Sequence, residues 1–169
     1  MNTKIIETKR LFLRELTISD AENMYLLNLD PEVLQFTGDE PFSDVQGAKT
    51  FLEKYDHYSK YGFGRWAVIN KENNDFLGWC GLKYSPELDE FDIGFRFFKK
   101  HWNKGYATEA AEACLKLGFE KFKMQKILGR AMLKNIGSIK VLEKIGLKYL
   151  KPFNFNDEQG VIYQIEKIS

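Results

Sequence analysis

The sequence predicts a mixed α/β domain, because runs typical of strands and runs typical of helices alternate along it. Short runs with alternating apolar residues predict strands, and apolar residues at helical spacing behind capping residues predict helices. The order is a strand, helices, three strands, a helix, a strand, a helix and two strands. The three middle strands follow one another through turns, so we expect them to pair antiparallel. A chain of 169 residues with 44% hydrophobic content predicts a single domain over residues 1–169 with a proper core.

The first half of the chain predicts one strand followed by a group of helices. Leu11 and Leu13 alternate with polar neighbours, which indicates a half-buried strand. Residues that cap helices recur after it. The expected elements are a strand over residues 10–15, a helix beginning at Ser19, a short helix opened by Asp30, and a longer helix from the capping box at residues 43–46 to about Tyr61.

The second half predicts a run of strands interrupted by two helices. Aromatic and β-branched residues mark the strands, and turn-forming residues separate them. Asn135 is a typical N-terminal helix cap, and Gly146 is a typical C-terminal one. The expected elements are strands over residues 65–70, 76–84 and 91–98, a helix from residue 105 or 106 to about 122, a strand over 126–133, a helix after Asn135, and strands over 147–150 and 160–166.

Residues 92–110, DIGFRFFKKHWNKGYATEA, predict an anion-binding site. A strand leads through a short polar loop into an alanine-rich helix that starts at Gly105. The first turn of a helix has backbone N–H groups without partners and a partial positive charge, and a glycine allows a close approach of the backbone. We therefore expect these amides to hold a phosphate or diphosphate. The P-loop pattern and the dinucleotide-binding glycine pattern are both absent, which excludes those two families.

This segment resembles the acyl-CoA-binding segment of the GNAT superfamily of N-acetyltransferases, most closely its ribosomal-protein-alanine N-acetyltransferase-like branch. Residues 93–95 match the strand of that segment and residues 102–110 match its loop and helix, although Asn103 replaces a usual glycine. A second block, NIGSIKVLEKIGL at 135–147, resembles the family's later helix, and residues 10–15 resemble its opening strand. The resemblance covers nearly the whole chain. It implies a mostly antiparallel central sheet that is splayed at the cofactor site, with helices on both faces.

The resemblance implies acetyl-CoA as the co-substrate, with its pantetheine arm lying between the two splayed strands. Those are the strand that ends near Phe97 and the strand that begins near Lys126. The side chains of Trp102 and Tyr106 have a second interpretation, which is that they pack the loop. The residues expected to contact the coenzyme are Phe95, Arg96 and Phe97 through their backbone, Trp102, Asn103, Lys104, Gly105, Tyr106, Ala107 and Thr108 around the diphosphate, and Asn135 beside the arm.

The expected catalytic residues are Ser138 and Asp92. The wider superfamily often has a tyrosine as the general acid seven residues after the asparagine, but this chain has Leu142 there. Ser138, in the first turn of the same helix, is the substitute that we predict, with a plain helix-start serine as the alternative. Asp92 is the predicted general base and Glu15 a second option. For both residues the alternative is a solvated or structural carboxylate.

The shortage of bases favours an acceptor amine of low pKa. About a tenth of a protein α-amine is neutral at pH 7, against less than a thousandth of a lysine amine. A protein N-terminus therefore fits best. A groove between the helices of residues 19–64 and the last hairpin is the expected acceptor site. The candidate lining residues are Phe36, Phe42, Tyr58, Phe63 and Trp66, and the neighbouring Asp39 and Glu40 would attract a cationic acceptor. The alternative is that these rings belong to the core and that the two acids lie in a solvated turn.

The overall composition excludes several other functions. A net charge of +1, from 25 basic and 24 acidic residues, argues against nucleic-acid binding by bulk electrostatics. No run could span a bilayer and no signal peptide begins the chain, so we expect a cytoplasmic protein. Cys80 and Cys114 are expected to be buried thiols, and no spacing of Cys or His suggests a metal site. The sequence leaves the choice between monomer and homodimer open.

Three functions therefore remain, and all of them use coenzyme A. The first is N-acetyl transfer to a protein N-terminal α-amine by direct attack in a ternary complex, since neither cysteine lies in the site segments. The second is acetylation of a small amine such as a polyamine, an amino acid or an antibiotic. The third is a CoA-binding sensor without turnover, which the missing tyrosine keeps open.

Overall fold

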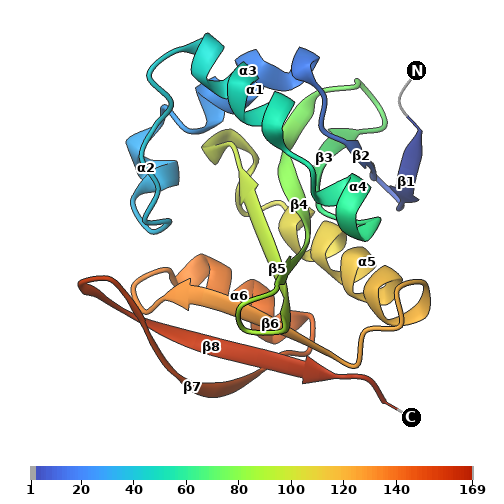
Figure 1. Ribbon diagram of the computed structural model, residues 1–169, viewed down its shortest axis with the longest axis vertical. Coiled ribbons are helices and arrows are strands. Elements are labelled where there is room, and N and C mark those ends of the chain that lie inside the picture. The colour runs from blue at the N-terminus through green and yellow to red at the C-terminus, as the bar shows by residue number, and fades with distance from the viewer. Residues whose placement is uncertain (1–2, 169) are drawn as a thin grey trace.

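The computed structural model describes residues 3–168, and over these it forms an eight-stranded sheet in the order β1-β2-β3-β4-β5-β6-β8-β7. Neighbouring strands pair antiparallel except β5 with β6. The predicted fold class, mixed α/β with a mostly antiparallel sheet, is confirmed. Figure 1 shows β1 at one edge and the β7–β8 hairpin at the other. The strands are β1 (Lys4–Glu7), β2 (Leu11–Glu15), β3 (Arg65–Asn70), β4 (Phe76–Ser85), β5 (Glu90–Phe97), β6 (Lys126–Met132), β7 (Lys148–Phe155) and β8 (Glu158–Glu166).

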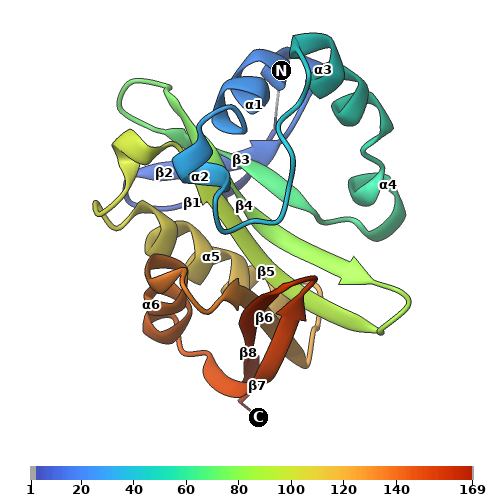
Figure 2. The same ribbon diagram turned by 90° about the vertical axis from the view of Figure 1, so that its left-hand side faces the viewer.

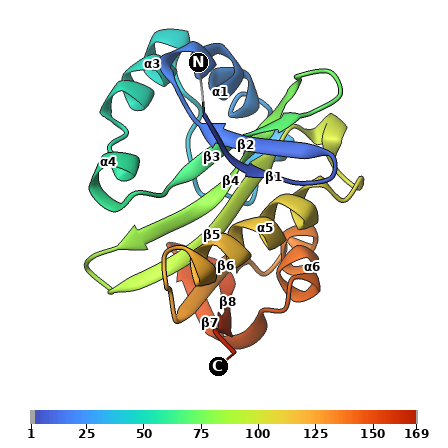
Figure 3. The same ribbon diagram turned by 90° about the vertical axis from the view of Figure 1, so that its right-hand side faces the viewer.

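Helices cover both faces of the sheet, as Figures 2 and 3 show from two sides. The helices α1 and α3 cover one face, where they pack on Ala67 and Ile69 of β3. On the other face α5 packs through Ala110, Ala111 and Cys114, small side chains that bring its backbone close to the strands. The helices are η1 (Ile18–Asp20), α1 (Ala21–Leu27), α2 (Pro31–Leu34), α3 (Val45–Lys54), α4 (His57–Tyr61), η2 (Lys99–His101), α5 (Tyr106–Glu120) and α6 (Ile136–Lys144).

The sheet opens between β5 and β6. These strands are parallel, and only Asp92 and Leu128 form a pair between them. Beyond that pair, the part of β5 from Ile93 to Phe97 keeps β4 as its neighbour and has no partner in β6 among residues 3–168. An unpaired strand edge presents free N–H and C=O groups that an extended ligand can bind. The predicted splay is therefore present, at the predicted pair of strands.

The two faces of β5 differ in character. Ile93, Phe95 and Phe97 pack into the core beneath α5. Asp92 and Arg96 point to the other face, where each forms an ion pair. Because successive side chains of a strand alternate between faces, β5 presents an apolar surface to α5 and a charged surface to the α1–α3 side.

The expected long helix from residue 43 to about Tyr61 is wrong in two respects. Asp44 caps it in place of Ser43, since an oxygen of the Asp44 carboxylate accepts from the Gly47 N–H at 2.8 Å. The helix also ends at Lys54, where Tyr55 has an extended backbone, and α4 begins separately at His57. The hydroxyl of Tyr55 accepts the Arg65 N–H at 2.8 Å, a tertiary contact that accompanies the break.

Candidate active site

A cavity of about 620 Å³ lies at the open end of the splay. It is bounded by β5, the loop before α5, the first turns of α5 and α6, and the end of α2. Of the residues predicted for the site, those in the lining are Phe95, Arg96, Phe97, Trp102, Asn103, Gly105, Tyr106, Ala107, Thr108, Asn135 and Ser138. Segments that lie about forty residues apart thus meet at one place, which is what a coenzyme with a long extended arm requires.

The loop before α5 has two residues with left-handed backbone. Asn103 has φ of 60° and Gly105 has φ of 82°. Asparagine is, after glycine, the residue that adopts this conformation most readily, so the exchange of the family's glycine for Asn103 preserves the backbone path. Loops that alternate right- and left-handed residues turn successive N–H groups toward one point, which makes an anion-binding concavity.

Trp102 holds this loop against β5. Its indole N–H donates to the carbonyl oxygen of Phe97 at 2.9 Å. The loop-packing interpretation of Trp102 therefore has direct structural support, although the ring also lines the cavity. Tyr106 likewise lines the cavity and makes a packing contact, since the centre of its ring lies 4.4 Å from the Cζ atom of Arg10.

Lys104 does not line the cavity, although the residues on both sides of it do. Its ammonium group turns back and donates to the carbonyl oxygen of Lys100 at 2.8 Å. Arg96 in the lining is paired with Asp39, so the unpaired positive charges come instead from α6 and the segment before it, namely Lys134, Lys140 and Lys144. None of these three forms an ion pair within residues 3–168, so their charge is free to attract an anionic ligand. The spacing of Lys140 and Lys144, one helical turn apart, is the sequence signal that could have identified them.

The first turn of α6 brings Asn135 and Ser138 to the cavity. The Asn135 side-chain oxygen accepts the Ser138 N–H at 3.2 Å, so the predicted helix cap is confirmed. That bond leaves the Asn135 amide group free to donate. Among residues 3–168 the Ser138 hydroxyl has no hydrogen-bond partner. Leu142 is 2% exposed and packs in the core, so its position does not face the cavity.

Asp92 lies outside the cavity, and its role as a general base remains a prediction. One oxygen of its carboxylate accepts from Arg65 at 2.7 Å, and the same guanidinium donates to the Gly81 carbonyl oxygen. Gly94 makes room for this pair, since an added Cβ would lie 2.7 Å from the guanidinium. Glu15, the second option, is exposed and also lies outside the cavity lining.

His101 is a lining residue that the sequence did not point to. Its Nε2 atom is buried and has no hydrogen-bond partner in the part of the chain that the structure describes. Burial, followed by the charges of Lys100 and Lys104, lowers the pKa of this imidazole. The ring is therefore predominantly neutral at pH 7.

Most of the aromatic side chains expected in an acceptor groove are in the core instead. Phe63 and Trp66 are 4% and 1% exposed. Tyr58 is held by hydrogen bonds to the Arg65 carbonyl oxygen and the Leu16 N–H. Phe36 does reach the cavity, together with neighbouring residues of α2. Large apolar rings are usually buried in the core, and this alternative to a groove lining is the one that the structure supports for these rings.

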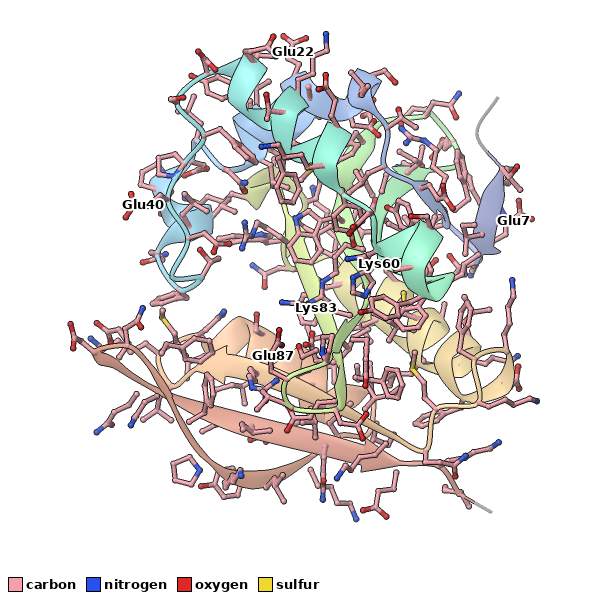
Figure 4. The ribbon with its side chains drawn as sticks, in the orientation of Figure 1. Glu7, Glu22, Glu40, Lys60, Lys83 and Glu87 are labelled. Carbon is pink, nitrogen blue, oxygen red and sulfur yellow. The ribbon has the colours of Figure 1, made fainter. Side chains whose placement is uncertain are left out.

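The two acidic residues after α2, Asp39 and Glu40, differ in their contacts. Asp39 pairs with Arg96 at 2.7 Å, and a second nitrogen of that guanidinium donates to the Asn28 side chain at 2.9 Å. The segment after α2 is thereby tied to the charged face of β5. Figure 4 shows Glu40 on the outside of that segment, and its side chain is exposed.

The sequence matches the family model of the acetyltransferase (GNAT) domain over residues 10–148. The chain belongs to the GNAT acetyltransferase family. This acetyltransferase is 32% identical to the Bacillus subtilis protein YkkB over 96% of this chain and 95% of that protein. It is 30% identical to the N-acetyltransferase p20 of Bacillus licheniformis, over 83% of this chain and 80% of p20.

Solved structures resemble the acetyltransferase over nearly its whole length. A GNAT-family acetyltransferase from Bacillus anthracis superimposes with a TM-score of 0.82 at 29% identity and covers 98% of both chains. The ribosomal L7/L12 α-N-protein acetyltransferase RimL also has a TM-score of 0.82, over 99% of this chain and 96% of RimL, and at 13% identity this likeness concerns the fold.

The family establishes the enzyme class as N-acetyltransferase, and GNAT acetyltransferases take the acetyl group from acetyl-CoA. Over residues 3–168, no three His, Cys, Asp or Glu side chains gather as metal ligands would. Within that same span, no helix combines the length and apolarity that crossing a membrane requires.

Proposed function

We propose that this acetyltransferase transfers acetyl from acetyl-CoA to a protein N-terminal α-amine, by direct attack in a ternary complex. One observation carries the proposal: the cavity joins the unpaired edge of β5, the amides of the loop and of α5, and the free hydroxyl of Ser138, with a lining almost without acids. Glu32 is the one acidic residue in the lining among residues 3–168, and it pairs with Lys99 at 2.5 Å.

The lining fits coenzyme A along its length. The left-handed backbone of Asn103 and Gly105 supports a concavity of amides for the diphosphate. The unpaired edge between Ile93 and Phe97 supplies backbone groups for the amides of the pantetheine arm. The Asn135 amide is available to the same arm, and the α6 lysines add positive charge for the phosphates.

Acetyl-CoA supplies the acetyl group as a thioester. The nitrogen of the neutral amine attacks the carbonyl carbon, the new C–N bond forms, and the C–S bond breaks. The departing thiolate needs a proton and the amine loses one. We assign the proton donation to the Ser138 hydroxyl, because it lines the cavity with no other partner among the residues described. The proton that the amine loses returns through water to the serine oxygen, so the hydroxyl is restored and the protons balance.

The choice of acceptor rests on the lack of a free carboxylate in the cavity lining among residues 3–168, where the neutral His101 ring has its Nε2 atom buried. The pKa of an α-amine is near 7.8 and that of a lysine amine is near 10.4, so at pH 7 the lysine has about 3.5 kcal/mol more to overcome in losing its proton. A site whose lining contains no free carboxylate favours the amine that is already partly neutral. Solved structures of this fold include one named as a ribosomal L7/L12 α-N-protein acetyltransferase and one named as a ribosomal-protein-S5-alanine acetyltransferase, which agrees with this assignment.

The test is release of free thiol from acetyl-CoA with a panel of acceptors. We expect release with peptides that carry a free N-terminus, and none with the same peptides blocked at the N-terminus but containing lysine. Release only with small amines would assign the enzyme to polyamine, amino-acid or antibiotic acetylation. Binding of CoA by calorimetry without release from any acceptor would point to a sensor.

Replacement of Ser138 by alanine is expected to lower kcat by about 10- to 100-fold while the KM for acetyl-CoA changes little. The α6 cap is retained, because Asn135 accepts from the Ser138 backbone N–H and not from its hydroxyl. Steady-state kinetics of Ser138→Ala beside Ser138→Thr make the comparison, since threonine keeps a hydroxyl. Equal kcat for the alanine variant and the parent would reduce Ser138 to a residue of the helix start.

A further inference from the structure

Two residues near the N-terminus, Thr8 and Arg10, form a cluster with one residue of α5 behind the loop that precedes α5. Glu109 lies in the first turn of α5. Its carboxylate accepts the Thr8 hydroxyl at 2.6 Å, the Arg10 backbone N–H at 2.9 Å and the Arg10 Nε–H at 2.7 Å. Neither Arg10 nor Glu109 lines the cavity.

The other end of the Arg10 guanidinium touches the loop at three successive residues. Its Nη1 donates to the carbonyl oxygen of Lys104 at 2.9 Å. A Cβ added to Gly105 would lie 3.2 Å from its Nη2, and its plane covers the Tyr106 ring at 4.4 Å. One side chain thus spans Gly105, the second of the two left-handed residues in the loop.

These contacts fix the direction of one peptide group. The Lys104 carbonyl oxygen accepts from Arg10, which lies outside the cavity lining, and the same peptide group carries the Gly105 N–H. Because C=O and N–H of a trans peptide point in opposite directions, holding that oxygen outside directs the Gly105 N–H toward the cavity side. A preorganised donor binds an anion without first losing conformational freedom.

We propose that Arg10, anchored by Glu109, is a positioning residue that holds the Lys104–Tyr106 backbone in its diphosphate-binding conformation. The inference rests on the coenzyme site proposed above and adds residues that do not contact the ligand. Glu109 is part of the same arrangement. Burial works to raise the pKa of its carboxyl, but the hydrogen bonds from Thr8 and Arg10 prevail and hold the pKa below its usual value. The carboxylate is therefore ionised and can anchor the guanidinium at neutral pH.

The Glu109→Gln variant separates two explanations of Glu109, because a charge effect and a positioning effect predict opposite changes in the affinity for CoA. Removing a negative charge near the diphosphate would strengthen binding if Glu109 acted through its field alone. A neutral amide cannot accept from all three donors, because its NH₂ group must face either the Arg10 N–H or the Arg10 Nε–H. We therefore expect the Kd for CoA, measured by calorimetry, to rise by about fivefold to tenfold.

Arg10→Lys is the second variant, because lysine keeps the positive charge. Its single ammonium group cannot donate to the Glu109 carboxylate and to the Lys104 carbonyl oxygen while it also covers the Tyr106 ring. We expect a Kd for CoA at least about fivefold higher, and kcat at saturating acetyl-CoA within about twofold of the parent. The affinity for S-acetylpantetheine, which has no diphosphate, should not change. Lys60→Ala is the control: it removes a charge from an exposed ion pair on α4, where Figure 4 labels the residue.

The ligand-free protein provides an independent readout. In ¹H–¹⁵N spectra without CoA, we expect the Gly105 amide signal to move in Arg10→Lys and Glu109→Gln and to stay in place in Lys60→Ala. Unchanged CoA affinity together with an unmoved Gly105 signal would overturn the proposal. If the parent itself fails to bind CoA, the coenzyme assignment fails. If the parent binds CoA and the variants bind it equally well, only the positioning role of Arg10 fails.

Discussion

Gly105→Val is expected to abolish measurable CoA binding, with a loss of at least about 100-fold, while the protein remains folded. A β-branched residue in left-handed backbone costs about 1–3 kcal/mol, which the loop can relieve by leaving that conformation. The Cβ would in addition lie 3.2 Å from the Arg10 guanidinium. A loop that changes its backbone conformation no longer directs its amides at one point, so the diphosphate loses several donors together.

Calorimetric titration with CoA measures this effect, and circular dichroism checks the fold. Gly47→Val is the matched control, because Gly47 lies in α3, remote from the cavity lining, and the nearest atom to an added Cβ is 3.5 Å away. We expect the control to bind CoA like the parent. A folded Gly105→Val protein with the parent's affinity would remove the diphosphate from this loop and with it the proposed site.

Arg14→Ala is expected to lower the free energy of unfolding by about 3 kcal/mol, the cost of leaving a buried charge without its partner. Two nitrogens of Arg14 donate to the two carboxylate oxygens of Asp20, each at 2.9 Å. Asp20 is 3% exposed. Its carboxylate also accepts the Thr17 N–H at 2.8 Å at the start of the helices on this face.

Urea denaturation followed by fluorescence measures the loss, which should appear as a lower midpoint with an unchanged m-value. Lys60→Ala serves as the control again, because its ion pair with Asp56 is exposed and we expect its midpoint to stay with that of the parent. A decrease of less than about 1 kcal/mol for Arg14→Ala would mean that the Asp20 carboxylate finds water or another donor.

The order of elements was predictable from the sequence because each depends on residues near one another in the chain. Asn135 caps the start of α6, and Gly146 has the positive φ angle expected of a glycine after the end of a helix. The errors concern strands, whose extent depends on a partner. Strand β1, only four residues long, was not predicted, and β7 extends to Phe155 beyond its expected end at residue 150. Strand ends are decided by pairing with a neighbour, and β7 gains its length from pairing with β8.

The residues that line the cavity were largely predictable because their motifs are two short continuous blocks, residues 93–110 and 135–138. Side-chain directions were not. Lys104 turns away from the cavity, Asp92 pairs with Arg65 on the other face of β5, and Phe63 and Trp66 are buried. Each of these outcomes depends on a neighbour brought close by sheet register or helix packing, which a local pattern does not contain.

The sequence by itself determined the family, the strand–loop–helix for which we propose the diphosphate site, and the caps at the two ends of α6. Only the tertiary structure decided which groups meet across long separations. Arg10 meets Glu109 although their positions are 99 apart in the sequence, and the sulfur atoms of Cys80 and Cys114, both buried free thiols, come within 3.8 Å. The physical reason is range: backbone conformation responds to the nearest few residues, whereas ion pairs and cavity walls depend on the packing of the whole sheet.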